Sequence, residues 1–358
     1  MRIGILNCGG DCPGLNAVIH GVVGAAAAKG WETIGFRDGF EGLLPAGGNF
    51  MFLTPKDTEG ILKMGGTILG TTNKGNFAAK IGEGDIAKVP QEIVDRAKKT
   101  LDHLAIGALV VVGGDGSLTT AQQLYEQGWP IIGVPKTIDN DLKATAMTFG
   151  FDSAVSTVVD ALDRLHTTAQ SHKRVMVLEV MGRHAGWIGL WGGMAGAANV
   201  ILLPEIPFTY EKIAEHLKKR EAQGYTSSLV VVAEGALNPD GDLATIDSNS
   251  GGQVRLGGIG EQVAAKIAEL TGKETRCTVL GHVQRGGTPT PLDRILGMRF
   301  GVMAAHLAED GEFGRMVSYQ SYHVGSVPIK EAIDELRLVQ PDTEVVKAAR
   351  AVGVCFGD

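Results

Sequence analysis

The feature that most constrains the fold is a pair of apolar strands, each of which ends in glycines or carboxylates. Residues 109–112 form an unbroken apolar run, typical of a parallel strand covered on both faces. Gly-Gly-Asp-Gly-Ser follows at 113–117, and a helix is predicted to begin near Ser117. A second apolar run, 131–134, leads to Lys-Thr-Ile-Asp-Asn-Asp at 136–141. Because ligands of open α/β sheets bind outside the carboxyl ends of the strands, the sequence predicts a site at this sheet edge.

The residue types at these two strand ends favour phosphoryl-transfer chemistry. Glycines at 113–116 allow backbone N–H groups and the positive end of the following helix to approach a phosphate closely. Asp115 stands where a hard oxygen ligand can hold Mg²⁺, and Thr137, Asp139 and Asp141 reach the same edge. Taken alone, the glycine segment is also consistent with a tight turn and its N-cap, and the second carboxylate cluster with turn chemistry. Their occurrence at the ends of successive strands favours the phosphate site.

A similar strand, glycine loop and helix occur near the N-terminus. A strand is predicted over 2–7, Gly-Gly-Asp-Cys-Pro-Gly occupies 9–14, and a helix follows from Leu15 to Ala28. This loop lacks the spaced G-x-G-x-x-G of dinucleotide folds, which disfavours a nicotinamide dehydrogenase. From spacing alone, the hydroxyl-rich stretch 65–75 is interpreted as a solvated loop.

Strand and helix patterns alternate through the rest of the chain, which predicts a largely parallel sheet in each of two domains. The length of 358 residues agrees with two domains. Residues 235–259 are rich in Gly, Asn, Asp and Ser and are predicted to form a long mobile loop. The further predicted strands are 32–36, 174–183, 201–203, 228–234 and 275–280, and the further helices are 91–105, 152–172, 209–223, 260–271 and 291–308.

Three strand ends in the second half carry candidate binding residues. Arg183 stands at the carboxyl edge of the strand predicted over 174–183, a placement that favours an anion site over a surface ion pair. Glu234 ends another strand, where it either binds hydroxyls or is a satisfied strand-end acid. The strand 275–280 enters Gly-His-Val-Gln-Arg-Gly-Gly at 281–287, a third candidate anion loop.

The charge and cysteine content narrow the classes of function. A net charge of −7 and a pI near 5.8 give no indication of a nucleic-acid or membrane-surface binder, so a phosphate site must be a local cluster of Arg and Lys. Cys8, Cys12, Cys277 and Cys355 form no C-x-x-C pair and are interpreted as free thiols in a reducing cytosol. A strand already begins at residue 2, and no apolar run reaches the roughly 20 residues of a spanning helix. We therefore expect a cytoplasmic protein without a signal peptide.

Five motifs, in order along almost the whole chain, give the sequence a resemblance to the 6-phosphofructokinases. They are GGDCPGLN at 9–16, GGDGS at 113–117, PKTIDND at 135–141, MGR at 181–183 and GHVQRGG at 281–287. The related NAD kinases and lipid kinases share the glycine-aspartate loop but not the Thr-Ile-Asp-Asn-Asp segment. The resemblance implies two Rossmann-like three-layer α/β domains with the active site in the cleft between them. It also implies transfer of a phosphoryl group to the 1-hydroxyl of fructose 6-phosphate.

Catalytic roles carry over by resemblance to matching positions. Asp139 becomes the general base for the sugar hydroxyl, a role that an ordinary ionised aspartate can fill at neutral pH. Thr137 orients the reacting groups. Asp115, with Asp141 as a second candidate, holds Mg²⁺ between the donor phosphates. Arg183 stabilises the charge that develops on the transferred group.

The resemblance also implies the binding residues and the roles of the two domains. The phosphoryl donor belongs to residues 1–150 plus about 284–334, and fructose 6-phosphate to 151–283 plus about 335–358. The relatives are oligomeric with shared sites, so Arg174 and Arg276 are expected to reach across from a neighbouring subunit of a homotetramer or homodimer. The implied sugar-phosphate residues are Thr137, Ile138, Asp139, Arg174, Met181, Gly182, Arg183, Glu234, Arg276, His282, Val283, Gln284 and Arg285, and the implied donor residues are Gly9, Asn73, Lys74, Gly114, Asp115, Gly116 and Ser117.

The donor-selectivity positions give a mixed signature. Gly116 leaves room for the α-phosphate of ATP, whereas Lys136 stands where pyrophosphate-dependent relatives carry lysine and many ATP enzymes carry glycine. Binding of ATP requires room for the nucleotide, and the additional ammonium group of Lys136 does not prevent it. ATP is therefore the predicted donor, with pyrophosphate as the alternative. At Asn73 many ATP enzymes have an arginine that bridges the substrates. Lys74 can supply a positive charge there, but its ammonium group cannot make the paired hydrogen bonds of an arginine guanidinium.

The regulatory positions also depart from the pattern of the well-regulated bacterial relatives. His20, Gly24 and His166 stand where those enzymes carry basic residues that bind an allosteric nucleotide. We therefore predict little response to ADP or phosphoenolpyruvate.

Asn73 alone suggests a rival hypothesis, a non-catalytic sugar-phosphate-binding subunit. The intact set of Thr137, Asp139, Asp115 and Arg183 argues against that rival.

Overall fold

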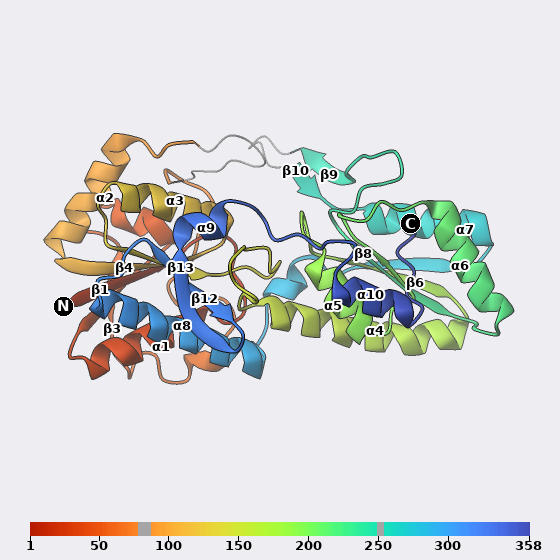
Figure 1. Cartoon of the computed structure of the whole chain (residues 1–358), viewed down its shortest axis with the longest axis horizontal. Helices are drawn as coiled ribbons and strands as arrows, with labels where there is room; N and C mark the ends of the chain where they lie inside the picture. The colour runs from red at the N-terminus through yellow and green to blue at the C-terminus, as the bar shows by residue number, and fades with distance from the viewer. Residues whose placement is uncertain (78–86, 249–253) are drawn as a thin grey trace. The chain divides into compact units, whose positions relative to one another are not determined.

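The computed structural model of the protein describes residues 1–77, 87–248 and 254–358. Its chain divides into two compact units. Unit 1 consists of residues 1–138, 142–153 and 285–336, and unit 2 consists of residues 139–141, 154–284 and 337–358. Each unit is an α/β body built on one main sheet (Figure 1).

Unit 1 contains a seven-stranded sheet in the order β13-β12-β5-β4-β1-β2-β3. The five central strands run parallel, and antiparallel β3 and β13 close the two edges. The apolar runs that predicted the buried strands lie in the middle of this sheet. The strands are β1 (Arg2–Asn7), β2 (Glu32–Phe36), β3 (Phe50–Leu53), β4 (Ile106–Gly113), β5 (Ile131–Pro135), β12 (Arg315–Gln320) and β13 (His323–Pro328).

Helices cover both faces of the unit 1 sheet, α1 and α8 on one and α2, α3 and α9 on the other (Figure 1). Glycines permit the close crossing of α1 and α8, because a Cβ at Gly21 would lie 2.3 Å from the Met298 carbonyl oxygen and one at Gly301 would lie 2.3 Å from the Val18 carbonyl oxygen. The helices are α1 (Leu15–Ala28), α2 (Gln91–His103), α3 (Asp115–Glu126), α8 (Pro291–Glu309) and α9 (Ile329–Ile333), with 3₁₀ helices η1 (Gly39–Leu43) and η2 (Ile61–Lys63).

Unit 2 contains a four-stranded, entirely parallel sheet in the order β11-β6-β8-β7. Helices α6 and α7 cover one face and α4 and α5 the other (Figure 1). The strands are β6 (Val175–Val180), β7 (Val200–Leu202), β8 (Ser228–Ala233) and β11 (Thr275–Val279). The helices are α4 (Phe151–His172), whose first three residues belong to unit 1, α5 (Trp187–Ala195), α6 (Tyr210–Ala222), α7 (Ile259–Thr271) and α10 (Glu344–Ala351), and 3₁₀ helix η3 (Gly281–Arg285) follows β11.

The structure confirms the α/β class with largely parallel sheets and corrects three predictions of secondary structure. The predicted loop 235–259 contains an antiparallel pair, β9 (Thr245–Ser248) with β10 (Val254–Leu256), while residues 249–253 lie outside the described part. The strand predicted over 174–183 is only β6, so both of its terminal arginines lie outside the strand. Helix α3 begins at Asp115, two residues earlier than predicted, because Gly114 already serves as its N-cap.

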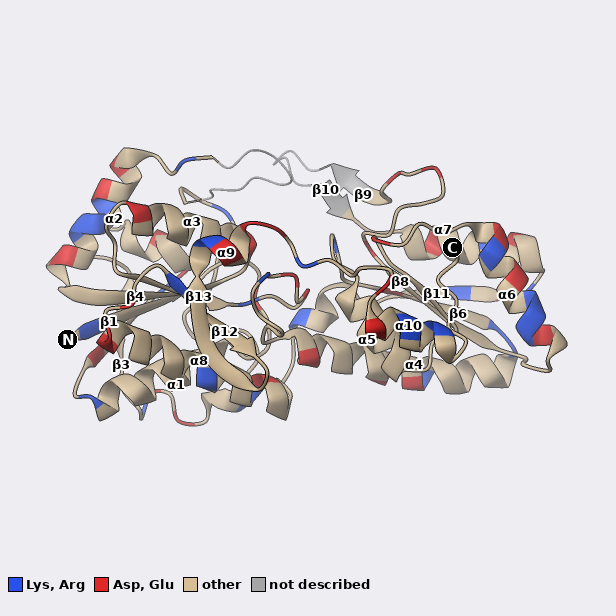
Figure 2. Ribbon diagram, viewed as in Figure 1, with Lys and Arg blue, Asp and Glu red and all other residues tan. Residues whose placement is uncertain are grey.

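Surface charges of both signs are interspersed along helices α2 and α6 (Figure 2). Within the described residues, no helix is long and apolar enough to cross a membrane.

Candidate active site

In unit 1, the carboxyl ends of the neighbouring strands β5, β4 and β1 bring the predicted donor residues together. The strands end in register, with Asn7 opposite Val112 and Gly113 opposite Pro135. Backbone hydrogen bonds continue past the strand ends, from Cys8 N to Val112 O at 2.9 Å and from Lys136 N to Gly113 O at 3.0 Å. Parallel strands therefore deliver three loops to one edge of the sheet, as the sequence predicts.

Glycine is required where the loop after β1 meets the loop after β4. Gly9 has a φ of +82°, and a Cβ there would lie 3.2 Å from Lys136 Nζ and 3.4 Å from Ser117 Oγ. A Cβ on Gly113 would lie 2.4 Å from Ser117 Cβ. Side chains at these two positions would occupy the space between the glycine loop and the start of α3.

The first turn of α3 is formed by Asp115, Gly116 and Ser117, all of them partly exposed. Its N-cap, Gly114, offers no side-chain acceptor to the N–H groups of that turn. The first N–H groups of an α-helix have no intrahelical acceptor, and the helix dipole places partial positive charge there. This helix end is therefore suited to an anion such as a phosphate.

Two cations stand beside the N-terminal glycine loop. Lys136 is only 5% exposed, and its Nζ donates a hydrogen bond to the Gly10 carbonyl at 2.5 Å. Burial lowers the pKa of this ammonium. Arg285 also belongs to unit 1, where its Nη1 donates to the Asp11 carbonyl oxygen at 3.4 Å and lies 1.9 Å from the position of a Cβ built on Gly10. The predicted sugar-phosphate residue Arg285 thus contacts the glycine loop.

The segment carrying Asn73 and Lys74 is exposed but attached to the same glycine loop. Gly9 N donates to the Thr72 carbonyl at 2.9 Å, and Thr71 Oγ1 donates to the Gly9 carbonyl at 2.7 Å. The interpretation of 65–75 as only a solvated loop therefore missed a direct connection to the predicted donor residues.

In unit 2, the carboxyl ends of β6, β8 and β11 bring together a second group of predicted residues. Glu234 N donates to the Val180 carbonyl at 2.8 Å, just before Met181, Gly182 and Arg183. Gly235 packs so closely that a Cβ there would lie 1.9 Å from the Arg183 carbonyl oxygen. Of the other predicted residues on this edge, His282 and Val283 are exposed.

Gln284 has a different environment from its exposed neighbours. It is 0% exposed, its Oε1 accepts from Met181 N at 3.3 Å, and its Nε2 donates to the Gly281 carbonyl at 3.0 Å. Its amide therefore joins the loop after β6 to the loop after β11.

Arg174 and Arg276 lie at the opposite end of the unit 2 sheet. Arg174 precedes β6, and Arg276 is the second residue of β11. Glu274 pairs with both of them, at 2.7 Å from Arg174 Nε and 2.5 Å from Arg276 Nη2. Arg276 is opposite Met176, so at about 3.3 Å per residue it lies roughly 17 Å along the strand from Met181, and Arg174 lies roughly 23 Å from it. The two predicted phosphate ligands are together, but not with the other sugar-phosphate residues of their own subunit.

The segment 139–141 belongs to unit 2, whereas Thr137 and Ile138 belong to unit 1. Thr148 Oγ1 donates to the Thr137 carbonyl at 2.7 Å, and Asn140 adopts a φ of +53°. The apposition of Asp139 and Asp115 stays a prediction. In the described part of the chain, no group of three or more His, Cys, Asp or Glu side chains is arranged to hold a metal ion by itself.

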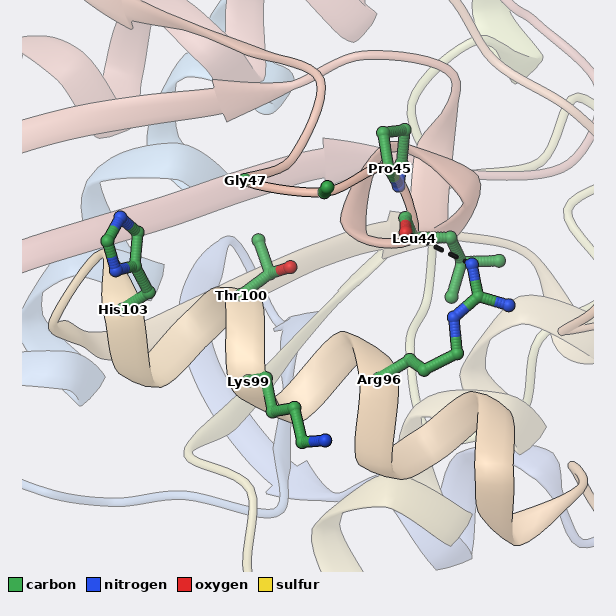
Figure 3. A pocket seen from close by; sticks show the side chains of 8 residues that line it. Leu44, Pro45, Gly47, Arg96, Lys99, Thr100 and His103 are labelled. Carbon is green, nitrogen blue, oxygen red and sulfur yellow. Dashed lines mark hydrogen bonds between the residues drawn. The ribbon is translucent and has the colours of Figure 1, made fainter.

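Unit 1 also contains a pocket of about 420 Å³ that includes none of the predicted site residues (Figure 3). It lies between α2 and the loop after η1. Arg96 reaches across it to donate to the Leu44 carbonyl at 3.3 Å. The lining residues are Leu44, Pro45, Ala46, Gly47, Arg96, Lys99, Thr100 and His103.

The sequence matches the phosphofructokinase family over residues 2–308. The chain belongs to that family. It is 50% identical over 357 residues to an ATP-dependent 6-phosphofructokinase of Chloroflexus aggregans, covering 100% of this chain and 98% of the relative. It is 48% identical to a pyrophosphate–fructose 6-phosphate 1-phosphotransferase of Amycolatopsis methanolica, covering 96% and 97%. Among solved structures, phosphofructokinase from Saccharomyces cerevisiae is 30% identical with a TM-score of 0.80, over 93% of this chain and 45% of that chain.

Membership of the phosphofructokinase family confirms the resemblance given by the five motifs and the two-sheet α/β fold. The relatives' names describe phosphotransferases, and the residues grouped in each unit are of types that suit phosphorylated substrates. Unit 1 groups helix-end N–H groups with cations, and unit 2 groups polar residues at the ends of its strands. The individual site residues stay predictions.

Proposed function

We propose that this enzyme transfers the γ-phosphoryl group of ATP to the 1-hydroxyl of fructose 6-phosphate, giving fructose 1,6-bisphosphate and ADP, the committed step of glycolysis. The observation that carries the proposal is the family match over residues 2–308, together with 50% full-length identity to an ATP-dependent relative. The proposal places the reaction in the cytoplasm.

In unit 1, the donor residues are Gly9, Asn73, Lys74 and the 114–117 segment. The first turn of α3 supports this assignment, because its N–H groups and dipole suit the donor phosphates. Gly116 within that turn leaves room for a nucleotide. Lys136 and Arg285 place positive charge beside the glycine loop.

Mg²⁺ fits the donor set of unit 1. Mg²⁺ usually keeps several waters and binds one or two carboxylates together with substrate phosphates, rather than a cage of protein ligands. Asp115, in the first turn of α3, supplies such a carboxylate beside the proposed phosphate site, and Asp141 is a second candidate. When bound, Mg²⁺ neutralises charge on the phosphate oxygens.

In the transfer step, Asp139 accepts the proton of the sugar 1-hydroxyl, whose oxygen then bonds to the γ-phosphorus. The bond from that phosphorus to the bridging oxygen breaks, and ADP leaves. Arg183 stabilises the charge on the transferred group, and its loss should cost on the order of 10²–10³ in rate. Thr137 orients the reacting groups.

The proposed sugar pocket combines residues that the resemblance assigns to fructose 6-phosphate. Those of unit 2 are Asp139, Met181, Gly182, Arg183, Glu234, His282 and Val283, and those of unit 1 are Thr137, Ile138 and Arg285. Gln284 supports the pocket through the Met181 backbone. We assign the 6-phosphate to Arg174 and Arg276 of a neighbouring subunit in a homodimer or homotetramer. Their place at the amino end of the strands, away from Met181 of their own subunit, supports this sharing.

A second candidate function is the same reaction with pyrophosphate as donor. Lys136 favours it, because its buried ammonium lies at the glycine loop. The 48% identical Amycolatopsis methanolica relative carries a pyrophosphate-dependent name. We prefer ATP because Gly116 leaves room for the α-phosphate.

A coupled assay that offers each donor in turn, with fructose 6-phosphate and Mg²⁺, tests the proposal. Turnover with ATP and little with pyrophosphate is the expected result. Turnover with pyrophosphate alone would select the second candidate, and binding of fructose 6-phosphate without turnover with either donor would select a non-catalytic subunit.

A further inference from the structure

A short C-terminal segment, residues 337–339, connects two parts of unit 2 that the proposed function treats as catalytic. Arg337 N donates to the Asp141 carbonyl at 2.7 Å, so the segment is attached to the 139–141 turn. The Arg337 carbonyl accepts from Trp187 Nε1 at 2.7 Å, and the Arg337 guanidinium lies 4.6 Å from the centre of the Trp187 ring. We call residues 337–339 the tether.

Glu205 binds the tether to the loop that carries Arg183. Its Oε1 accepts from Val339 N at 2.8 Å and from Gly186 N at 2.9 Å, and its Oε2 also accepts from Gly186 N at 3.2 Å. Burial raises the pKa of Glu205, and the two backbone donors oppose that rise. Removing the side chain would leave both N–H groups without this acceptor, which costs about 1–3 kcal/mol for each buried group.

Gly186 is packed against the same carboxylate. A Cβ there would lie 2.9 Å from Glu205 Oε2 and 2.8 Å from Leu203 Cδ2. Gly186 is the N-cap of α5 and stands three residues after Arg183. Glu205 thus fixes the far end of the Arg183 loop, while Gly182 at its near end accepts from Gly235 N at 3.2 Å.

We propose that Glu205 is a positioning residue for phosphoryl transfer, which fixes the Arg183 loop and, through the tether, the 139–141 turn. The proposal rests on the roles of Asp139 and Arg183 in the proposed function. Glu205 touches no substrate in this scheme and acts only on the geometry of these two segments. A displacement of about 1 Å between reacting groups can cost 10²-fold in rate.

Three variants separate positioning from general stability. Glu205→Ala removes the shared acceptor. Glu205→Gln keeps an oxygen that can take the place of Oε1 and accept from both Gly186 N and Val339 N. Glu179→Ala is the control, because Glu179 is a buried carboxylate of unit 2 that also accepts from two backbone N–H groups, those of Gly258 at 3.1 Å and Gly260 at 2.8 Å.

The readouts are kcat, the KM for each substrate, the melting temperature, and hydrogen exchange of peptides covering 139–142 and 182–187. For Glu205→Ala we expect kcat to fall about 10- to 100-fold, the KM for the donor to change less than threefold, and exchange to rise in both peptides. Glu205→Gln should restore kcat to within about threefold of the parent. Glu179→Ala should lower the melting temperature without changing kcat or exchange in either peptide.

Parental kcat and exchange in Glu205→Ala would overturn the proposal, as would a Glu205→Gln variant as slow as Glu205→Ala. Failure of the proposed function has a different signature, which is parental turnover in Asp139→Ser or Arg183→Ala. The exchange measurement needs no substrate, so it tests the attachment of both segments whichever donor the enzyme uses.

Discussion

Asp293 is a buried carboxyl group whose ionisation should make unit 1 less stable as pH rises. It is 0% exposed in the first turn of α8, and its Oδ2 accepts from Ser153 N at 2.8 Å and from Ser153 Oγ at 2.7 Å. Burial raises its pKa from 3.8 to about 6, the bonds from Ser153 and Gly150 oppose that rise, and nearby Asp152 adds to it.

The sign of the effect follows from proton linkage. Between pH 3.8 and about 6 the folded protein holds this proton while the unfolded chain has lost it, so stability falls as pH rises through that window. Below the window the contribution is fully present, and above it the contribution is lost. The whole difference is about 3 kcal/mol, of which about 2 kcal/mol falls between pH 4 and pH 7.

The perturbation that isolates this term is Asp293→Asn. Asparagine keeps the shape of the side chain and an oxygen that can accept from Ser153, but it does not titrate. Urea unfolding of both proteins at the same pH cancels every other titrating group. We expect the parent to lose about 2 kcal/mol relative to the variant between pH 4 and pH 7.

A stability difference between the two proteins that stays constant from pH 4 to pH 7 would refute the assignment. So would a parent that gains stability relative to the variant over the same range.

Asp139→Ser should lower kcat by about 10²–10⁴ while calorimetry still detects fructose 6-phosphate binding, and unchanged turnover would remove the base assignment. Gly116→Asp should lower kcat/KM for ATP at least tenfold by about 1.4 kcal/mol or more of steric and charge repulsion, and equal kinetics would contradict the steric argument. Gly301→Ala should destabilise the protein by about 1–3 kcal/mol, seen as a lower melting temperature, because the new methyl group meets the Val18 carbonyl at 2.3 Å. ADP and phosphoenolpyruvate should change the fructose 6-phosphate saturation curve little, and a strong shift would contradict the predicted loss of the effector cluster.

Apolar pattern and glycine punctuation predicted the elements that surround the donor residues. The bounds of β1, α1 and β2 agree with the predictions, because each is an apolar run closed by a glycine or a turn. The paired strands β9 and β10 were missed, since they are only four and three residues long and lie in a stretch with the composition of a loop. In such a stretch, cross-strand pairing rather than local propensity decides the structure.

The relation between Arg174, Arg276 and Glu274 was partly visible in the sequence. Arg174 directly precedes one strand and Arg276 is the second residue of another, so a parallel pairing of those strands places them side by side at the amino end. Which strands are neighbours is a tertiary property, and it is set by the order β11-β6-β8-β7. Glu205 gave no signal at all, because its partners are backbone N–H groups of Gly186 and Val339, far away in the chain.

An acidic chain can bind phosphorylated substrates only through local clusters of positive charge, and Lys136 shows how such a cluster works. Its ammonium is buried and donates a hydrogen bond to the neutral carbonyl of Gly10. Burial disfavours the charged form and nearby Arg285 adds to that effect, so the pKa of Lys136 is lowered although Asp11 opposes the shift. A phosphate at the glycine loop would offset that cost and raise the pKa again, so donor binding should favour the charged lysine. The same residue that marks the pyrophosphate users can therefore strengthen binding of the phosphates of ATP, provided that Gly116 leaves room for the rest of the nucleotide.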